Sequence, residues 1–286
     1  MTAFSTKLAD ASARNRSLLC VGLDPDPRLA PPALVGQDGW VARFVLGIVE
    51  ATVDLVCAFK PNFAFYEALG DEGYRGLRAV MDGLPKDVVS IGDAKRGDVE
   101  STAAAYARAL FEVWGFDAVT VSPYLGGDSL DPFTRYADRA VIVICKTSNR
   151  GSGDLQDLDV SWQGAAMPLY EAVARQVVAR NTAGNLGLVV GATYPEQLAR
   201  VRSIAPDLPI LVPGVGAQQG DLEAAATAGL DAAGGGILVN ASRGVLYASS
   251  GDDWQAAARA AALDLRDRID AVRQARAGRE QAGAPR

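Results

Sequence analysis

Short runs of apolar, largely β-branched residues recur along the whole 286-residue chain, separated by longer stretches with helical spacing. Because these runs show almost no alternation with polar residues, they are typical of strands buried on both faces, as in a parallel sheet. We expect one strand in each run, at residues 17–24, 55–62, 88–95, 118–124, 140–147, 186–193, 209–216 and 235–243.

The stretches between these runs are rich in alanine and place apolar residues three and four positions apart, which predicts amphipathic helices. Clear examples are residues 40–53, 98–114 and 167–181. The apolar runs begin about 31 residues apart on average, which is the size of one strand–helix–strand step. Eight such units favour an α/β fold, a single-domain (β/α)8 TIM barrel over residues 1–286.

A doubly wound open sheet is the competing architecture, but no GxGxxG sequence follows the first predicted strand. No linker, low-complexity tract or second domain is evident. We expect a short helical segment at residues 2–15, and a polar tail at about residues 271–286 that forms a frayed helix end.

The chain contains no histidine, which narrows the chemistry more than any other feature of its composition. Ser–His–Asp and Cys–His nucleophilic sites, histidine bases and histidine-containing zinc or iron sites are all excluded. Any catalysis must depend on carboxylates, amines, hydroxyls, backbone amides or a bound cofactor, and we predict no metal site.

The charge distribution indicates which partners and location to expect. With 28 basic and 34 acidic residues the net charge is −6, and the absence of a basic run argues against binding of nucleic acid. Neither a signal peptide nor an apolar segment of about 18 residues is present, so we expect a cytoplasmic protein without a membrane partner. Cys20, Cys57 and Cys145 each lie in an apolar run and form no CxxC motif, which predicts buried, reduced thiols.

Three of the five lysines lie at the ends of predicted strands, where a barrel carries its functional residues. These are Lys60, Lys95 and Lys146. An ammonium at the end of a buried strand is costly unless it is paired, so we expect an anionic group to meet it. For Lys146 the sequence indicates no role beyond that of a solvated or structurally paired lysine.

The densest cluster of charges lies at residues 93–98. Asp93 and Lys95 are two apart on an extended strand and should point to the same face. Lys60 could reach Asp93 from the neighbouring strand, which with Asp98 predicts an alternating Lys–Asp–Lys–Asp array. In such an array an ammonium can act as proton donor. The structural alternatives are an ion pair of Asp93 with Lys95, and Asp98 as the N-cap of the next helix.

The last two strand ends favour a phosphate. Barrels often bind phosphate with the loops after strands seven and eight, which here span residues 213–220 and 240–245. Arg243 supplies a guanidinium that can pair with phosphate oxygens in a bidentate manner. Close approach of the backbone is allowed by Gly214, Gly216 and Gly244.

Four motifs now stand in order on these strand ends: FKPNFAFYE (59–67), DAKRGDVEST (93–102), PGVGAQ (213–218) and NASRG (240–244). In these motifs the chain resembles the orotidine 5′-phosphate decarboxylase family, and most of all its longer bacterial branch, from about Ser17 to Tyr247. The resemblance implies decarboxylation of orotidine 5′-monophosphate to uridine 5′-monophosphate in de novo pyrimidine biosynthesis, without a metal or organic cofactor.

The resemblance also implies roles for individual residues. Lys95 would donate a proton to C6 of the pyrimidine, Asp93 would lie against the departing carboxylate, and Lys60 would orient the array and contact the ribose. Asp98 and Thr102 would reach the ribose region of the partner subunit's site, which implies a homodimer. The substrate would further be bound by Asp24 at the ribose hydroxyls, Ser148 at the pyrimidine edge, Pro213 near the base, and Gln218, Arg243 and Gly244 at the phosphate.

The chain departs from shorter family members at residues 148–159, which form a longer polar segment around Ser148. Three other functions remain open on sequence alone. They are a related phosphosugar lyase such as a Mg²⁺-dependent 3-keto-gulonate 6-phosphate decarboxylase, a Schiff-base aldolase that uses Lys60 or Lys95, and a non-catalytic nucleotide-binding barrel.

Overall fold

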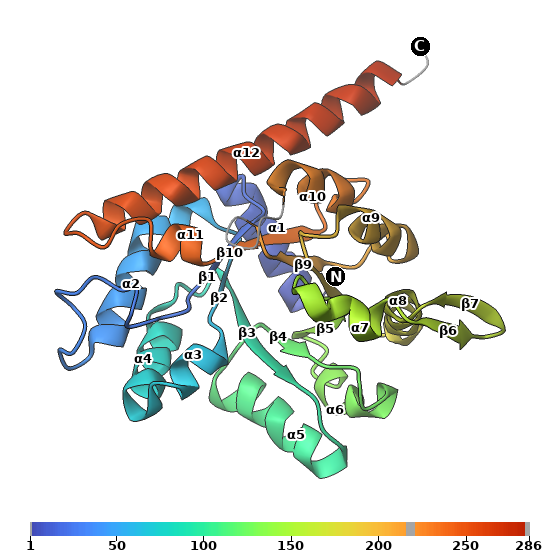
Figure 1. The fold of residues 1–286 in the computed structure, drawn as a ribbon, viewed down its shortest axis with the longest axis horizontal. Helices are drawn as coiled ribbons and strands as arrows, with labels where there is room; N and C mark the ends of the chain where they lie inside the picture. Colours follow the sequence, from blue (N-terminus) through green and yellow to red (C-terminus); the bar gives the residue numbers. More distant parts are fainter. Residues whose placement is uncertain (1, 216–220, 284–286) are drawn as a thin grey trace.

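Eight parallel strands close into a barrel in the computed structural model, which describes residues 2–215 and 221–283 (Figure 1). Around the barrel the strands follow the order β1-β10-β9-β8-β5-β4-β3-β2. The (β/α)8 barrel predicted from the eight apolar runs is therefore confirmed. The strands are β1 (Leu19–Gly22), β2 (Ala58–Lys60), β3 (Val89–Arg96), β4 (Ala118–Val121), β5 (Ala140–Lys146), β8 (Leu186–Val190), β9 (Ile210–Pro213) and β10 (Ile237–Ala241).

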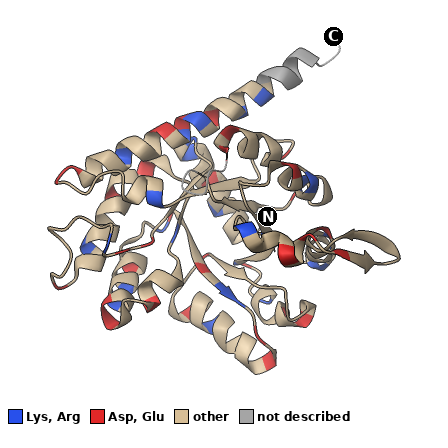
Figure 2. Ribbon diagram, viewed as in Figure 1, with Lys and Arg blue, Asp and Glu red and all other residues tan. Residues whose placement is uncertain are grey.

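Helices surround the barrel and bury their apolar faces against the outside of the strands (Figure 1). The longer ones are α2 (Trp40–Thr52), α4 (Gly70–Gly83), α5 (Glu100–Arg108), α8 (Leu169–Arg180), α9 (Pro195–Ile204), α10 (Leu222–Gly229) and α12 (Trp254–Gly283). Shorter helices are α3 (Phe63–Glu67), α6 (Asp131–Thr134), α7 (Gly153–Gln156) and α11 (Arg243–Leu246). Figure 2 shows that most charged residues lie on these helices and on the loops rather than on the strands.

α1 (Ala3–Asn15) agrees with the short helical segment expected at residues 2–15, and it covers one end of the barrel. Phe4 packs into the apolar cluster inside the barrel. Lys7 pairs with Asp117 at 2.7 Å, and Asp117 also accepts hydrogen bonds from the backbone N–H and hydroxyl of Ser90. α1 covers the end at which the strands begin, and the cavity available to a ligand lies at the opposite end, where the strands finish.

All three cysteines are free and buried, as predicted. Burial raises the pKa of both Cys57 and Cys145 to about 12. Because the thiolate is the reactive form of cysteine, neither thiol is suited to be a nucleophile near neutral pH.

Two predicted helix boundaries need correction. A two-stranded hairpin of β6 (Asp159–Trp162) and β7 (Ala165–Pro168) projects between β5 and α8, so the helix expected at residues 167–181 begins only at Leu169 (Figure 1). In the helix expected at residues 98–114, α5 begins at Glu100 and passes into a π-helical turn, Ala109–Val113.

The carboxyl-terminal segment forms one long helix. Residues 271–283 continue α12 to Gly283, and the helix runs along the barrel and extends beyond it (Figure 1). No helix within the described part of the chain is long and apolar enough to span a membrane.

Candidate active site

A cavity of about 680 Å³ opens at the carboxyl ends of the strands, a volume in the range typical of small-molecule sites. It is lined by residues from strands on all sides of the barrel, so the closed sheet brings together groups that lie far apart in sequence. Seven of the predicted site residues line it: Asp24, Lys60, Asp93, Lys95, Ser148, Pro213 and Arg243.

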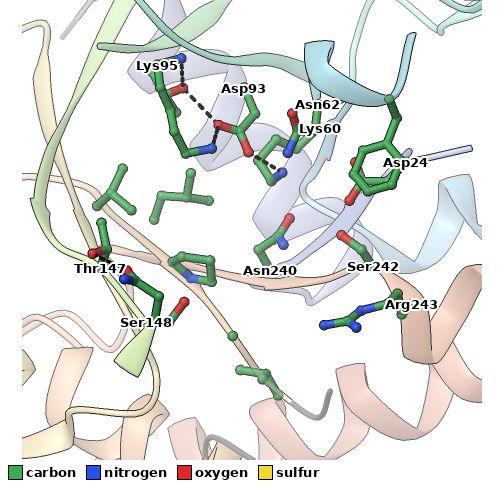
Figure 3. A pocket seen from close by; sticks show the side chains of 18 of the residues that line it. Asp24, Lys60, Asn62, Asp93, Lys95, Thr147, Ser148, Asn240, Ser242 and Arg243 are labelled. Carbon is green, nitrogen blue, oxygen red and sulfur yellow. Dashed lines mark hydrogen bonds and ion pairs between the residues drawn. The ribbon is translucent and has the colours of Figure 1, made fainter. Parts of the chain in front are cut away.

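Two ammonium groups flank one carboxylate in this cavity. Nζ of Lys60 lies 2.9 Å from Oδ2 of Asp93, and Nζ of Lys95 lies 2.6 Å from Oδ1 of the same residue (Figure 3). The Lys60 and Asp93 side chains are almost fully buried, whereas that of Lys95 is half exposed to the cavity. The half-exposed ammonium is therefore the one that a ligand can contact most directly.

The backbone of β3 deviates from regular strand geometry where it carries these groups. Gly92 pairs with Val119 and Arg96 with Val121, so four steps along β3 match two steps along β4. Lys95 lies inside this bulge with a left-handed φ of 47°. Asp93 and Lys95 do point into the same cavity, but the regular extended strand expected between them is wrong, because the bulge re-aims the chain.

The charges set the ionisation of the buried groups. Burial alone would lower the pKa of Lys60, but the carboxylates of Asp93 and Asp24 outweigh it and raise that pKa above its ordinary value. Burial opposes ionisation of Asp93, yet Lys60 and Lys95 hold its pKa well below the usual range. Lys60 is thus an ammonium and Asp93 a carboxylate near neutral pH.

Burial has the larger effect at Asp24, which lies just beyond β1. It raises the pKa of the Asp24 carboxyl, although Lys60 and the hydroxyl of Ser242 act in the opposite direction. The segment is held by Tyr247, whose hydroxyl donates to the carbonyl oxygen of Asp24 and accepts from the N–H of Asp26, both at 2.6 Å. The backbone that carries the carboxyl is therefore held in place, while burial disfavours the ionised form of the carboxyl.

Several polar groups in the cavity lack partners. Oδ1 of Asp24 and Oδ1 of Asn240 are buried without a hydrogen bond among residues 2–215 and 221–283. The guanidinium of Arg243, the first residue of α11, has no ion pair or hydrogen bond to any side chain the structure describes (Figure 3). Buried polar atoms are almost always paired in proteins, so the two acceptors indicate a ligand that donates hydrogen bonds. The exposed guanidinium of Arg243 at the same cavity is available to pair with a negative charge.

No metal centre emerges from the described residues, since no three His, Cys, Asp or Glu side chains among them could hold an ion together. The buried carboxylates at the cavity are already engaged by lysines or held apart from one another.

Three predicted site residues do not line the cavity. Asp98 is half-buried and precedes α5, Thr102 is exposed in the first turn of α5, and neither lines the cavity. Gly244, in α11, does not line it either, and Gln218 lies outside the described residues. The interpretation of Asp98 as a helix N-cap is wrong, because α5 begins at Glu100 and its N-cap is Val99.

Lys146 is fully buried at the end of β5 and structurally paired. Its Nζ lies 2.7 Å from Oδ1 of Asp157 and 4.5 Å from the centre of the Tyr194 ring. It is thus a structural lysine beside the site.

Sequence reasoning assigned no role to several residues that line the cavity: Asn62, Thr120, Thr147, Asn149, Asn240 and Ser242. The signal was present for Thr120, since it is a polar residue between Val119 and Val121 in an apolar strand. Asn240 and Ser242 stand in the same strand-end motif as Arg243 and Gly244, to which the sequence analysis did assign roles.

Together, a (β/α)8 barrel and a strand-end cavity with buried ammonium and carboxylate groups define a barrel enzyme that acts on a small anionic molecule. Residues 17–261 match the model of the orotidine 5′-phosphate decarboxylase / HUMPS family. The chain is 51% identical to the orotidine 5′-phosphate decarboxylase of Azoarcus sp. (strain BH72), over 94% of this chain and 99% of that protein.

Solved structures give the same result. The OMP decarboxylase of Leishmania donovani is 43% identical and superposes with a TM-score of 0.82, over 96% of this chain and 99% of the other. UMP synthase of the same organism is 44% identical with a TM-score of 0.83, and here the match covers 96% of this chain but 57% of the longer protein. The chain belongs to the orotidine 5′-phosphate decarboxylase family and is a decarboxylase.

Proposed function

We propose that this enzyme converts orotidine 5′-monophosphate to uridine 5′-monophosphate in pyrimidine biosynthesis, without a metal or organic cofactor. The observation that carries the proposal is the Lys60–Asp93–Lys95 group, with its half-exposed ammonium, at the opening of the strand-end cavity. Similarity over nearly the full length to proteins named orotidine 5′-phosphate decarboxylase supports this choice of substrate.

The proposed reaction breaks the bond between C6 of the pyrimidine and its carboxylate carbon. The electron pair of that bond stays on C6 as CO₂ leaves, so a carbanion develops and needs a nearby positive charge. The ammonium of Lys95 supplies the charge and then its proton, which goes to C6, and the resulting amine regains a proton from solvent. Asp93 stays ionised beside the substrate carboxylate, and repulsion between the two favours loss of CO₂.

The unpartnered groups suit the rest of this substrate. Arg243 would pair with the phosphate, together with Gln218 and the backbone at Gly244. Asp24, whose Oδ1 lacks a partner among the described residues, would accept hydrogen bonds from the ribose hydroxyls. Ser148 would contact the pyrimidine edge and Pro213 the base. Binding energy from the remote phosphate would then offset strain at the reacting carbon.

The active unit of the proposal is a homodimer in which Asp98 and Thr102 complete the ribose region of the partner subunit's site. Its support is that both residues lie outside their own chain's cavity, where Thr102 is exposed and Asp98 is half-buried. Large apolar side chains nearby are also exposed, namely Val99, Tyr106, Tyr124 and Leu125. A Lys95→Ala chain mixed with an Asp98→Ala chain should regain activity that neither variant has alone, because one site of each mixed dimer is then intact.

We also place the reaction in the cytoplasm, a reducing compartment in which the three free cysteines are stable.

The deciding experiment is a spectrophotometric assay with orotidine 5′-monophosphate in the presence of EDTA. We expect the substrate to be consumed and uridine 5′-monophosphate and CO₂ to form in equal amounts. Loss of activity with EDTA and its return with Mg²⁺ would indicate a metal-dependent phosphosugar lyase. A covalent adduct trapped by borohydride would indicate Schiff-base chemistry at a lysine. Binding of uridine 5′-monophosphate without turnover of the substrate would indicate a non-catalytic barrel.

A further inference from the structure

Thr120 in β4 contacts two members of the charge group at once. Its hydroxyl oxygen Oγ1 accepts a hydrogen bond from the backbone N–H of Lys95 at 3.0 Å and lies 2.9 Å from Oδ1 of Asp93. The residue is 1% exposed and belongs to the lining of the cavity. Neither the strand-end motifs nor the roles that the family resemblance implies involve it.

The direction of these hydrogen bonds follows from the chemistry of the groups. A threonine hydroxyl has a single proton, and its oxygen is already an acceptor for the N–H of Lys95. Asp93 is ionised and can only accept, so the hydroxyl proton must point to Oδ1. Oδ1 also accepts from the ammonium of Lys95 at 2.6 Å. The result is a closed ring from the backbone of Lys95 through Thr120 and Asp93 to the Lys95 ammonium.

This ring of hydrogen bonds lies at the β3 bulge, where the backbone of Lys95 is left-handed. Thr120 is the single β4 residue between the Gly92–Val119 and Arg96–Val121 pairs, so it faces the bulge that carries Asp93 and Lys95. Lys95 has a φ of 47°, and a left-handed backbone costs free energy for any residue with a Cβ atom. Lys95 donates its backbone N–H to Oγ1 of Thr120 while it is in this left-handed conformation, and this hydrogen bond offsets part of the cost.

We propose that Thr120 is a positioning residue whose hydroxyl holds the left-handed backbone of Lys95 and thereby aims the Lys95 ammonium at C6 of the pyrimidine. The proposal rests on the proposed function, since it deepens the role of Lys95 in that reaction. Thr120 itself transfers no proton. It holds the proton donor and Asp93 at a fixed separation, and small displacements of a donor have large kinetic effects.

The test compares Thr120→Val with Thr120→Ser. Valine has nearly the same shape but no hydroxyl, whereas serine keeps the hydroxyl and loses a methyl group. We expect Thr120→Val to lower kcat by about 10- to 100-fold with KM changed by less than about 3-fold. Thr120→Ser should stay within about 3-fold of wild type. Thr52→Val is the matched control, since Thr52 is equally buried but its hydroxyl bonds to the carbonyl of Ile48 in α2.

Two further measurements separate positioning from a merely structural role. In D₂O, NMR of bound uridine 5′-monophosphate follows exchange of the C6 proton, which reports on the proton donor without the decarboxylation step. Thr120→Val should slow this exchange about as much as it lowers kcat, while its affinity for uridine 5′-monophosphate stays the same. A crystal structure of Thr120→Val should show Lys95 out of the left-handed region and its ammonium moved away from Asp93.

Three outcomes would overturn the proposal: wild-type kcat in Thr120→Val, an equal loss in Thr120→Ser, or unchanged Lys95 geometry in the Thr120→Val crystal structure. Failure of the proposed function is distinguishable, because wild type itself would then leave orotidine 5′-monophosphate unchanged. In that event the crystal structure alone still decides whether Thr120 holds Lys95 in place.

Discussion

The two ends of the barrel differ in whether their buried polar groups have hydrogen-bond partners within the protein. Near the ends where β9 and β10 begin, the guanidinium of Arg202 in α9 is 8% exposed and fully engaged. It donates five hydrogen bonds of 2.6–3.1 Å to the carbonyl oxygens of Ala205, Pro206, Leu208, Gly229 and Gly236. At the opposite end, Oδ1 of Asp24 and of Asn240 have no partner in the described ranges of the chain.

The difference separates stability from function. Arg202 joins α9 to the segments that precede β9 and β10, and each of its hydrogen bonds is formed without a ligand. Its charge is still costly, since burial lowers the pKa of Arg202 to about 10 although Asp231 and Asp207 oppose the shift. At the open end the binding capacity of Asp24, Asn240 and Arg243 is left unused until a ligand arrives.

The largest effect should come from Lys95→Ala at the open end. The substitution removes both the proton donor and the charge that stabilises the carbanion, so we expect turnover to fall by about 10⁴-fold. Unfolding in urea should change by about 1 kcal/mol or less, because the Lys95 side chain is half exposed and Lys60 still pairs with Asp93. Retention of a tenth of the wild-type rate would assign the proton donor to another residue.

Arg202→Met should show the reverse pattern. Five hydrogen bonds to carbonyl groups are lost at once, so the free energy of unfolding should fall by about 3–5 kcal/mol, measured in urea. The KM of the folded fraction at low temperature should be unchanged. Arg268→Met, in α12, is the control: its side chain and that of its partner Glu223 are both about half exposed, so the loss should be about 1 kcal/mol or less. Equal losses in both variants would contradict the comparison.

Asp24→Asn should weaken ligand binding and increase the stability of the fold. Burial raises the pKa of Asp24 above its ordinary value of 3.8, despite the opposing charge of Lys60. The folded protein therefore binds this proton more tightly than the unfolded chain does, and the resulting stability is lost as the pH rises above about 4. Because asparagine does not ionise, the variant should gain about 1 kcal/mol over wild type between about pH 4 and pH 7. Its affinity for uridine 5′-monophosphate should fall about 10-fold.

Asp26→Asn is the control with the opposite sign. A hydrogen bond from the Arg28 side chain lowers the pKa of Asp26 against a smaller effect of burial. The ionised form of Asp26 therefore stabilises the wild-type fold above the unfolded-state pKa. Relative to wild type, this variant should become less stable as the pH rises from about 4 to 7. The measurement for both variants is urea unfolding at the two pH values. The same pH trend in both would refute the assignment for Asp24.

At the open end, the sequence predicted which residues meet better than it predicted the detailed geometry of those residues. Continuous apolar runs locate all eight barrel strands, and strand ends must converge in a closed barrel, so Lys60, Asp93 and Arg243 could be placed in one cavity. The bulge at Lys95 could not be predicted, because it depends on a register shift between β3 and β4 rather than on local composition. The hydrogen bonds of Thr120 depend on that bulge, so they could not be predicted from the sequence either.

The closed end was hardly predicted at all. Nothing near Arg202 in the sequence marks it as buried, because its five acceptors are backbone carbonyls contributed by three separate segments. Hydrogen bonds to the backbone leave no pattern in side-chain types. Arginines that pair with surface carboxylates, such as Arg268, look the same in the sequence as Arg202.

Lys146 combines features of both ends, and its variants should have the smallest effects. It lies at a strand end beside Ser148, yet its ammonium is already paired with Asp157, and Thr147 is linked to Gln156 in the same loop. These contacts fold the segment after β5 back over the strand end. We expect Lys146→Met and Asp157→Asn each to raise KM by a few-fold, about 3 to 5, with kcat nearly unchanged.

The two variants should differ in stability, and that difference tests the interpretation. Lys146→Met removes a fully buried charge, and Asp157, whose side chain is 45% exposed, can be solvated by water. Its cost in urea unfolding should be about 0.5 kcal/mol or less. Asp157→Asn leaves the buried ammonium with only the Tyr194 ring and a neutral amide, so it should cost about 1–2 kcal/mol. A larger loss in Lys146→Met would mean that the packing of the lysine stem, and not its ion pair, holds the loop at the cavity.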